Sequence, residues 1–473
     1  MAKTAISHNG HIDWKTLAAL MMGFACYRLY ISIFFVANNV MPQPSSTGLG
    51  AYDLYGILLA VLVLASALIK QERFFTSNTV AVFGSACMML GTILYHVETP
   101  LTIWLFAPLS GIGVALLTVQ WGLALGRNDH HVTALAVIGG FICSAALNSG
   151  IGSFDVVYII MSALSGPASC AFLLRARQMA HQGKEIEKNE GTDGKFVGKA
   201  AAAFSLFAAA SVFCSVPMEF SVIELTGNAQ SALPLLRTCA TALVAFIALA
   251  CTLLPGFSIK AIYRLIPLFL IIGGLSLFLQ EAMPLIAYLC ALVGRLGFQL
   301  MFWIFAPRIA QCSKKPTASV FAIEFSMYWL GYTASLLLVR LQWPDKLMAS
   351  IDTMGSIVVI AIVILMIAYL FIFSENDLRL ATEAARADRS SPSEEHSASN
   401  ADFLSNIAKE HDLSPRETEV FMLLARGRDS RYIQETLYIS AGTVSTHRQR
   451  IYKKLGIHTK QELFDLIESR EKA

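Results

Sequence analysis

Charged residues are scarce in this chain of 473 residues, where they make up 15% against roughly 25% in ordinary soluble domains. This scarcity argues against a purely soluble enzyme. The nine cysteines are scattered, with no CxxC pair and no histidine at metal-ligand spacing, so neither disulfides nor a metal site is expected. Without a Walker motif, paired catalytic carboxylates or a nucleophile constellation, we expect no enzyme and no cofactor. The net charge of only +3 excludes a bulk basic protein that coats nucleic acid.

The charge that is present is divided unevenly along the chain. Residues 1–374 are about 10% charged, whereas residues 375–473 are about 32% charged. The first part therefore has the composition of a membrane domain and the second that of a soluble one. Residues 14–37 are apolar for longer than a signal-peptide core and no small-residue cleavage site follows them, so they are expected to form the first membrane span.

Long apolar runs fill the first part of the chain. A transmembrane helix needs about 20 mostly apolar residues, and we expect twelve such spans. Their extents are 14–37, 49–69, 75–96, 100–126, 131–149, 154–174, 199–219, 231–254, 262–282, 284–307, 318–340 and 354–374.

Basic residues in the loops between these spans predict the topology. Sixteen of them fall in alternate loops on one side, while the other side carries only Arg340 and Lys346. Because lysine and arginine are retained on the cytoplasmic side, both termini are expected to be cytoplasmic.

The longest internal polar stretch, residues 175–199, divides the spans six plus six. This layout resembles the major facilitator superfamily of transporters, over residues 1–374 and in architecture only. The loop after span two reads KQERFF in place of that superfamily's Gly/Asp/Arg signature. The resemblance implies an all-α bundle around a central cavity.

Ionisable residues inside spans are costly and mark functional sites by default. Arg28 and Arg295 lie mid-span, in helices that line the central cavity of major-facilitator-like folds. Two arginines beside aromatic rings suit a small anion with an apolar body, such as an aromatic or aliphatic carboxylate. An internal ion pair such as Arg295 with Glu324, or snorkelling to the headgroups, is the structural alternative. The candidate ligand residues are Arg28, Gln120, Trp121, Arg295, Gln299 and Glu324. Of the ionisable residues in spans, Arg237, Glu219 and Glu324 are expected nearer an interface.

Residues 375–412 are expected to be a flexible cytoplasmic linker, because the stretch SSPSEEHSASN is polar and of low complexity. If fully flexible, its 38 residues span about 35 Å root mean square. That reach lets a small domain contact DNA beside the membrane.

Residues 413–473 carry the signals of a soluble four-helix domain. Ser414, Pro415 and Glu417 give a capping box with proline at the first helical position. A third helix begins after Ser440 and ends at Gly456. Thr459 with Glu462 forms a second capping box. The expected core consists of Val420, Leu423, Leu424, Ile433, Leu437, Val444, Ile451 and Leu455.

The third helix has basic residues and no acid, while Val444, Ile451 and Leu455 mark its buried stripe. Two short helices joined by a tight turn, the second cationic, are typical of a helix-turn-helix that enters the major groove. A merely solvated charged face is the structural alternative. The candidate DNA-contacting residues are Thr443, Ser445, Thr446, His447, Arg448, Gln449, Arg450, Lys453 and Lys454.

Residues 413–463 closely resemble the DNA-binding domain of LuxR/FixJ-type bacterial regulators, since LSPRE-TEV, LLARG, the IS turn, TV-x-x-H and I-x-x-KLG all stand at family spacing. The resemblance implies that Glu417 is a structural acid and that Thr443, Arg450 and Lys454 contact phosphates. It places Ser445, Thr446 and Gln449 on the base-contacting face, where the family often has lysine at the first and last position. The fourth helix, with Leu463, Phe464 and Ile467, is implied to support dimerisation.

Together these features predict a membrane-embedded one-component transcription regulator of the bacterial inner membrane. Its expected partners are promoter DNA bound as a homodimer, RNA polymerase, membrane lipid and a small-molecule ligand in the bundle. The first alternative is a major-facilitator-like transporter with a regulatory DNA-binding tail. The second is a membrane anchor without a ligand, controlled by partners or by the membrane.

Overall fold

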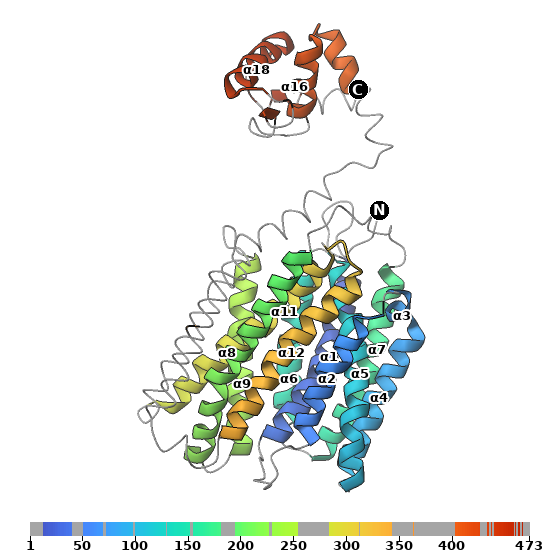
Figure 1. The fold of residues 1–473 in the computed structure, drawn as a ribbon, viewed down its shortest axis with the longest axis vertical. Coiled ribbons are helices and arrows are strands. Elements are labelled where there is room, and N and C mark those ends of the chain that lie inside the picture. The colour runs from blue at the N-terminus through green and yellow to red at the C-terminus, as the bar shows by residue number, and fades with distance from the viewer. Residues whose placement is uncertain are drawn as a thin grey trace. The chain divides into compact units, whose positions relative to one another are not determined.

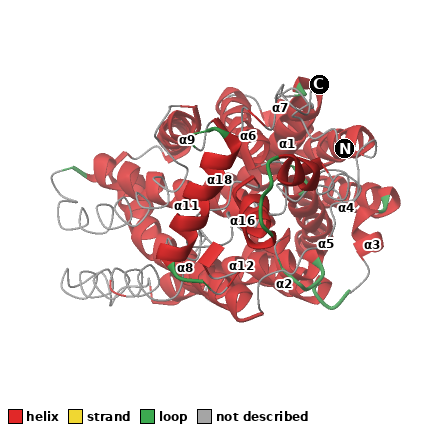
Figure 2. Cartoon of the chain, turned by 90° about the horizontal axis from the view of Figure 1, so that it is seen from above, coloured by secondary structure: helices red, strands yellow, loops and turns green. Residues whose placement is uncertain are grey.

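A computed structural model of the chain divides it into two compact units, Met1–Ala385 and Arg386–Ala473. The described residues are 13–39, 51–69, 72–97, 100–128, 130–151, 155–180, 194–226, 229–253, 283–311, 313–342, 363, 403–425, 433–434, 437, 439–457, 459, 462–463 and 466. Within these ranges the regular structure is helical, as Figure 2 shows. The all-α prediction is confirmed.

The first unit is a bundle of long helices (Figure 1). Ten of the twelve expected spans coincide with described helices, whose ends differ by a few residues from the predicted ones. The spans expected at 262–282 and 354–374 lie outside the described residues, apart from Val363. The ten helices are α1 (Trp14–Asn39), α2 (Ala51–Ser66), α4 (Asn78–His96), α5 (Pro100–Gly126), α6 (His130–Ile151), α7 (Asp155–Ala180), α8 (Gly194–Thr226), α9 (Ala229–Leu253), α11 (Pro284–Gln311) and α12 (Thr317–Gln342).

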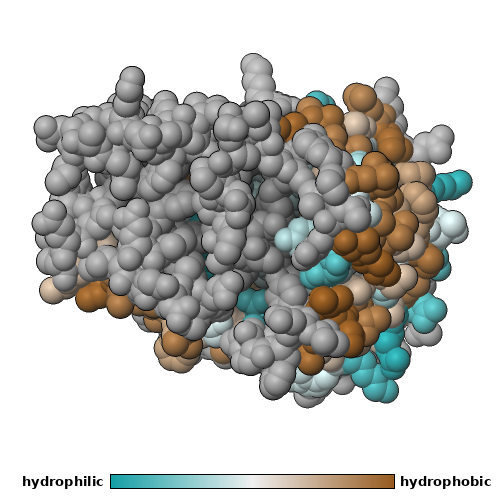
Figure 3. Space-filling model, turned by 90° about the horizontal axis from the view of Figure 1, so that it is seen from below, coloured by the Kyte–Doolittle hydropathy of each residue, from teal (hydrophilic) through white to brown (hydrophobic). Residues whose placement is uncertain are grey.

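Length and composition suit this bundle to a bilayer. Five stretches within the described residues are long and apolar enough to span a membrane, namely Asn78–His96, Leu105–Gly126, His131–Asn148, Ile159–Met179 and Leu285–Gln311. Large apolar side chains cover their outer faces, and brown hydrophobic atoms dominate the coloured flank in Figure 3. In a soluble protein such exposure is unfavourable, whereas lipid tails accept it.

Helices of the two halves of the bundle pack against each other through α2 with α12, α6 with α9, and α11 with α5. Small residues permit close approach, as is common between membrane helices.

Within the second half, a side-chain Cβ at Gly331 of α12 would lie 2.1 Å from the carbonyl oxygen of Ser205 in α8. Any larger residue there would force these two helices apart.

A short helix, α3 (Glu72–Thr76), occupies the loop after the second span. Its Glu72 Oε1 accepts a hydrogen bond of 2.6 Å from the backbone N–H of Thr317, the first residue of α12. On its other side, the Arg177 guanidinium of α7 donates to the carbonyl oxygens of Phe75 and Thr76, at 3.1 and 3.2 Å. The helix α3 therefore joins the two halves at one end of the bundle.

The second unit has its own apolar core, which α16 (Pro415–Ala425) and α18 (Ala441–Leu455) share. All eight core residues expected from the sequence belong to it. Residues 403–410, which we call the leading helix, also pack here, with Leu404, Ile407 and Ala408 buried. The expectation of a flexible linker over 375–412 therefore differs from the structure beyond residue 402. The apolar spacing of Phe403, Leu404 and Ile407 explains why this segment folds onto the domain.

Candidate DNA-contacting helix and membrane cavity

The helix α18 begins and ends where its capping residues predict. The Ser440 hydroxyl accepts a hydrogen bond from the backbone N–H of Thr443 at 3.2 Å. Gly456 follows the helix in the left-handed conformation, with φ of 68°, which glycine adopts without strain. Both capping predictions are confirmed.

One face of α18 is buried and another is open to solvent. Val444, Ile451 and Leu455 are buried in the core, as predicted. The exposed side chains Thr446, Gln449, Arg450 and Lys453 stand three, four and seven positions apart and so share one face. This polar face carries two cations, and no described acid pairs with either of them.

The other candidate DNA-contacting residues are less exposed to solvent, except Lys454. Ser445, His447, Arg448 and Thr443 are half-buried, and the Thr443 hydroxyl lies 2.8 Å from that of Ser440. The Nδ1 atom of His447 is buried with no hydrogen-bond partner among the described residues. These residues flank the exposed face rather than form it.

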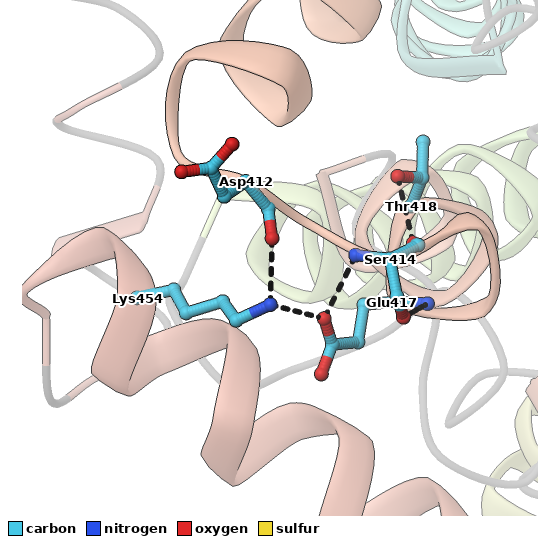
Figure 4. A network of polar contacts seen from close by, with 5 residues as sticks. All are labelled: Asp412, Ser414, Glu417, Thr418 and Lys454. Carbon is cyan, nitrogen blue, oxygen red and sulfur yellow. Dashed lines mark hydrogen bonds and ion pairs between the residues drawn. The ribbon is translucent and has the colours of Figure 1, made fainter.

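Lys454 takes part in an internal network that Figure 4 shows. Its Nζ donates to the Asp412 carbonyl oxygen at 2.6 Å and to Glu417 Oε2 at 2.8 Å. Glu417 Oε2 also accepts from the backbone N–H of Ser414 at 2.9 Å, which completes the predicted capping box. The Lys454 ammonium and this backbone N–H hold the pKa of Glu417 at about 2. We call this network the Lys454 clamp, because it ties α18 to the start of α16 and to the end of the leading helix.

Glu417 therefore has the structural role that the family resemblance implies, whereas Lys454 has a role the sequence did not indicate. Its prediction as a phosphate contact stays a prediction. The second capping box is present, since the Glu462 backbone N–H donates to Thr459 Oγ1 at 3.1 Å. Leu463 is buried in the core, while Phe464 and Ile467 of the expected dimerisation helix lie outside the described residues.

The membrane bundle contains a cavity of about 110 Å³. It brings together Arg28, Arg295 and Gln299, three of the six candidate ligand residues, and adds Arg237. Arg237 was expected nearer an interface, and that expectation did not indicate that its side chain would face the cavity, because helix rotation cannot be read from position along α9.

Each of two arginines of the cavity has a defined environment. Arg28 is 6% exposed and its guanidinium carbon lies 3.4 Å from the centroid of the Phe141 ring, in a cation–π contact. Arg295 Nη1 donates to Ser215 Oγ at 3.0 Å. No ion pair joins Arg295 to Glu324 within the described residues, so the internal-pair alternative does not describe this conformation.

The remaining three candidates lie elsewhere in the bundle. Gln120 accepts a hydrogen bond of 2.7 Å from Arg177, and Trp121 donates one of 2.9 Å to Ser169. Glu324 is fully buried away from the cavity lining, and neither of its carboxyl oxygens has a hydrogen-bond partner among the described residues. The side chain of Glu219 lies outside the described residues.

Comparison with known sequences identifies the second unit. Residues 411–467 match the family described as bacterial regulatory proteins, luxR family. The chain is 43% identical over 63 residues to the Fimbriae Z protein of Salmonella typhimurium, and 47% identical over 47 residues to the transcriptional regulatory protein MctR of Rhizobium johnstonii. These matches cover 13% and 10% of this chain, and 30% and 22% of the relatives, so the chain spans less than a third of either relative's length.

Comparison with solved structures identifies the fold of the first unit. A bacterial homologue of the iron transporter ferroportin superposes with a TM-score of 0.55 at 11% identity, over 79% of this chain and 99% of that one. The proton:xylose symporter XylE, a major facilitator superfamily protein, gives 0.54 at 11% identity, over 77% and 98%. The human organic anion transporter MFSD10 gives 0.54 at 10% identity, over 74% and 99%. The chain thus joins a bundle with the major facilitator fold to a C-terminal segment, residues 411–467, that matches the luxR family of bacterial regulatory proteins.

Proposed function

We propose that this protein is a membrane-embedded one-component transcription regulator, whose LuxR-type domain binds promoter DNA and whose bundle senses a small anionic molecule. The exposed polar face of α18, set on a core that matches the LuxR family, carries this proposal. A helix of this kind enters the major groove, where Gln449 and Thr446 contact base edges and Arg450 and Lys453 contact phosphates.

The bundle supplies the sensing part. One buried and two half-buried arginines line a cavity, within a fold that other proteins use to surround small substrates. Ligand binding changes DNA occupancy only if the ligand prefers one of two bundle conformations. Residues 1–374 have the composition of membrane spans throughout, so any sensing element in this part of the chain is the bundle.

The loop charges support a location in the bacterial inner membrane with both termini in the cytoplasm, where lipid would surround the bundle and the C-terminal domain would meet DNA. We further propose that it binds a two-fold DNA site as a homodimer, the fourth helix of the domain taking part, and that RNA polymerase is its partner at the promoter. No catalytic step enters this function.

Genome-wide crosslinked DNA occupancy tests the proposal. The Gln449→Ala, Arg450→Ala double variant is expected to lose the discrete peaks of the wild type, while Lys409→Ala keeps them. Lys409 is an equally exposed residue of the same domain, outside α18, and so controls for a general loss of positive charge. Discrete peaks retained in the double variant, or absent from the wild type under every condition, would refute DNA regulation through this face.

A second candidate function is transport, with the DNA-binding domain as a regulatory tail. The major facilitator fold with its internal cavity favours it. Uptake into sealed vesicles separates the two functions. Saturable accumulation of a ligand supports the transporter, whereas binding without accumulation supports the sensor.

A further inference from the structure

The cavity of the bundle is strongly cationic. Arg28 of α1, Arg237 of α9 and Arg295 of α11 line it, and none of the described residues that line it is acidic. Arginine inside a membrane bundle is costly unless it meets a partner. Resting on the function proposed above, we propose that this cavity binds a compact carboxylate with an apolar body, which reaches it from the extracytoplasmic side.

Arg28 provides the clearest sign of a missing partner. Its side chain is more than nine-tenths buried, it lines the cavity, and its Nε has no hydrogen-bond partner among the described residues. The Phe141 ring holds one face of the guanidinium and fixes its plane. A buried donor left unsatisfied is destabilising, and a carboxylate satisfies a guanidinium through two parallel hydrogen bonds.

The rest of the lining selects an apolar body of limited size. Trp303, Tyr328 and Leu292 contribute aromatic and aliphatic walls, while Gln299 and Asn148 add amides. The volume of about 110 Å³ is smaller than the roughly 150 Å³ of a protein cavity that accommodates benzene. A cavity of this order suits a ligand body of a single ring or a short chain.

The positions of the lining residues along their helices give the depth of the cavity. It meets residues 27–32 of α1, 144–148 of α6, 237–241 of α9, 292–303 of α11 and 328–332 of α12. The segments of α9, α11 and α12 lie at or close to the middle of their helices, and those of α1 and α6 lie past it. The cavity therefore lies near the middle of the bundle, and the side from which a ligand enters depends on which end of the bundle is closed.

Contacts between the two halves close the cytoplasmic end. Glu72 bonds to the first N–H of α12, and a Cβ at Gly126 of α5 would lie 2.8 Å from the carbonyl oxygen of Pro307 in α11. A Cβ at Gly122 of α5 would lie 2.3 Å from the ring of Phe321 in α12. Among the described residues, these contacts pack α5, α11 and α12 closely at this end, so we expect a ligand to enter from the other end. Figure 3, viewed from the end opposite α3, shows teal hydrophilic atoms towards the middle of that face.

Binding of benzoate to the purified full chain in nanodiscs tests the ligand class. We expect saturable binding that benzamide, its neutral isostere, and inorganic phosphate do not displace. Arg28→Gln and Arg295→Gln are expected to weaken benzoate binding at least 10-fold, the loss of a charge-assisted hydrogen bond. Arg73→Gln, at an exposed arginine of α3 outside the cavity, serves as the matched control and binds as the wild type does.

Several results overturn the assigned ligand class. Saturable binding of neither benzoate nor butyrate, equal displacement by benzamide or phosphate, or benzoate binding unchanged in Arg28→Gln would each do so. Arg28→Lys keeps the charge but loses the planar guanidinium, so its affinity for benzoate is expected to lie between those of the wild type and Arg28→Gln. This variant tests the site even if Arg28→Gln fails to fold. DNA occupancy of the same variants separates the two proposals. Peaks without benzoate binding overturn only the site, whereas binding without any effect on the peaks overturns only the sensing function.

Thiol labelling on intact cells tests the side of access. Asn148→Cys, at the cavity, is expected to react with a membrane-impermeant maleimide added outside, and benzoate is expected to slow the reaction. Arg73→Cys, on the cytoplasmic side, is expected to react only after lysis, and the unmodified chain gives the background of its native cysteines. Reaction of Asn148→Cys only after lysis, or of Arg73→Cys before it, would overturn the extracytoplasmic access.

Discussion

Neutralising Glu417 tests the Lys454 clamp quantitatively. The carboxylate accepts hydrogen bonds from Lys454 at 2.8 Å and from the backbone of Ser414 at 2.9 Å, and its side chain is only 5% exposed. The change of its pKa from 4.5 to about 2 corresponds to an upper limit of about 3 kcal/mol of stabilisation. Because the Lys454 side chain is 38% exposed, water weakens the pair, and we expect Glu417→Gln to cost about 1.5 kcal/mol.

The dependence on pH follows from the direction of the shift. The pKa of Glu417 is lower in the folded domain than in the unfolded chain, so its stabilisation is complete above about pH 4.5 and is lost as the pH falls towards 2. The difference between wild type and Glu417→Gln is therefore expected to be largest at pH 7. At pH 3 it is expected to fall to less than half of that value.

Hydrogen exchange of the full chain in nanodiscs measures this effect. Amides of α16 and α18 report the free energy of opening of the domain, after correction for the intrinsic rate at each pH. Glu419→Gln is the control, since Glu419 pairs with Arg416 across an exposed i,i+3 position of the same helix, where such pairs contribute at most about 0.5 kcal/mol. Equal effects of the two variants, or a Glu417→Gln effect as large at pH 3 as at pH 7, would refute the reasoning.

Three further variants test other parts of the structure. Lys453→Ala is expected to weaken binding to all DNA sequences alike and to reduce the slope of log binding constant against log salt concentration by about 1. Gln449→Ala is expected to relax the preference for particular bases. DNA titrations at several salt concentrations measure both effects. Glu72→Gln weakens the hydrogen bond to Thr317 and is expected to lower the thermal stability of the bundle in detergent by about 1 kcal/mol, a prediction that an unchanged melting temperature contradicts. Leu404→Ala is expected to cost the C-terminal domain about 2 to 4 kcal/mol because the residue is buried, and the absence of any effect on hydrogen exchange would mean that the leading helix is not part of the fold.

The amino-acid sequence predicts the C-terminal domain more completely than the bundle. Capping boxes, the glycine after α18 and the apolar stripe each constrain the same few helices, and all appear where expected. The leading helix escaped prediction because the polar stretch before it suggested a linker up to residue 412. The internal role of Lys454 was not predicted either, since a lysine at the end of a cationic helix suggests a DNA contact more readily than an internal partner.

In the bundle the sequence predicts where helices begin and end but not how they are rotated. Nearly uniform apolarity leaves no polar face to orient a helix, and packing against neighbours decides instead. Arg28 and Arg295 face the cavity as expected, whereas Gln120 and Trp121 turn towards Arg177 and Ser169. Arg237 of span eight could have been predicted as a cavity residue, because an arginine inside a span marks a candidate site whatever its distance from the membrane surface.

The completeness of the C-terminal domain limits how the bundle can regulate it. Its core, its two capping boxes and the Lys454 clamp are formed by described residues within 403–466. Coupling between two binding sites typically amounts to about 1 to 3 kcal/mol, comparable to the clamp alone and too little to unfold a domain. If the protein is the regulator proposed above, a ligand in the cavity is expected to act through the position of the domain or through its pairing with a second copy, which change the effective concentration at DNA. Ligand-dependent changes in occupancy are then expected to lie between about 5-fold and 150-fold, with the hydrogen exchange of α18 unchanged.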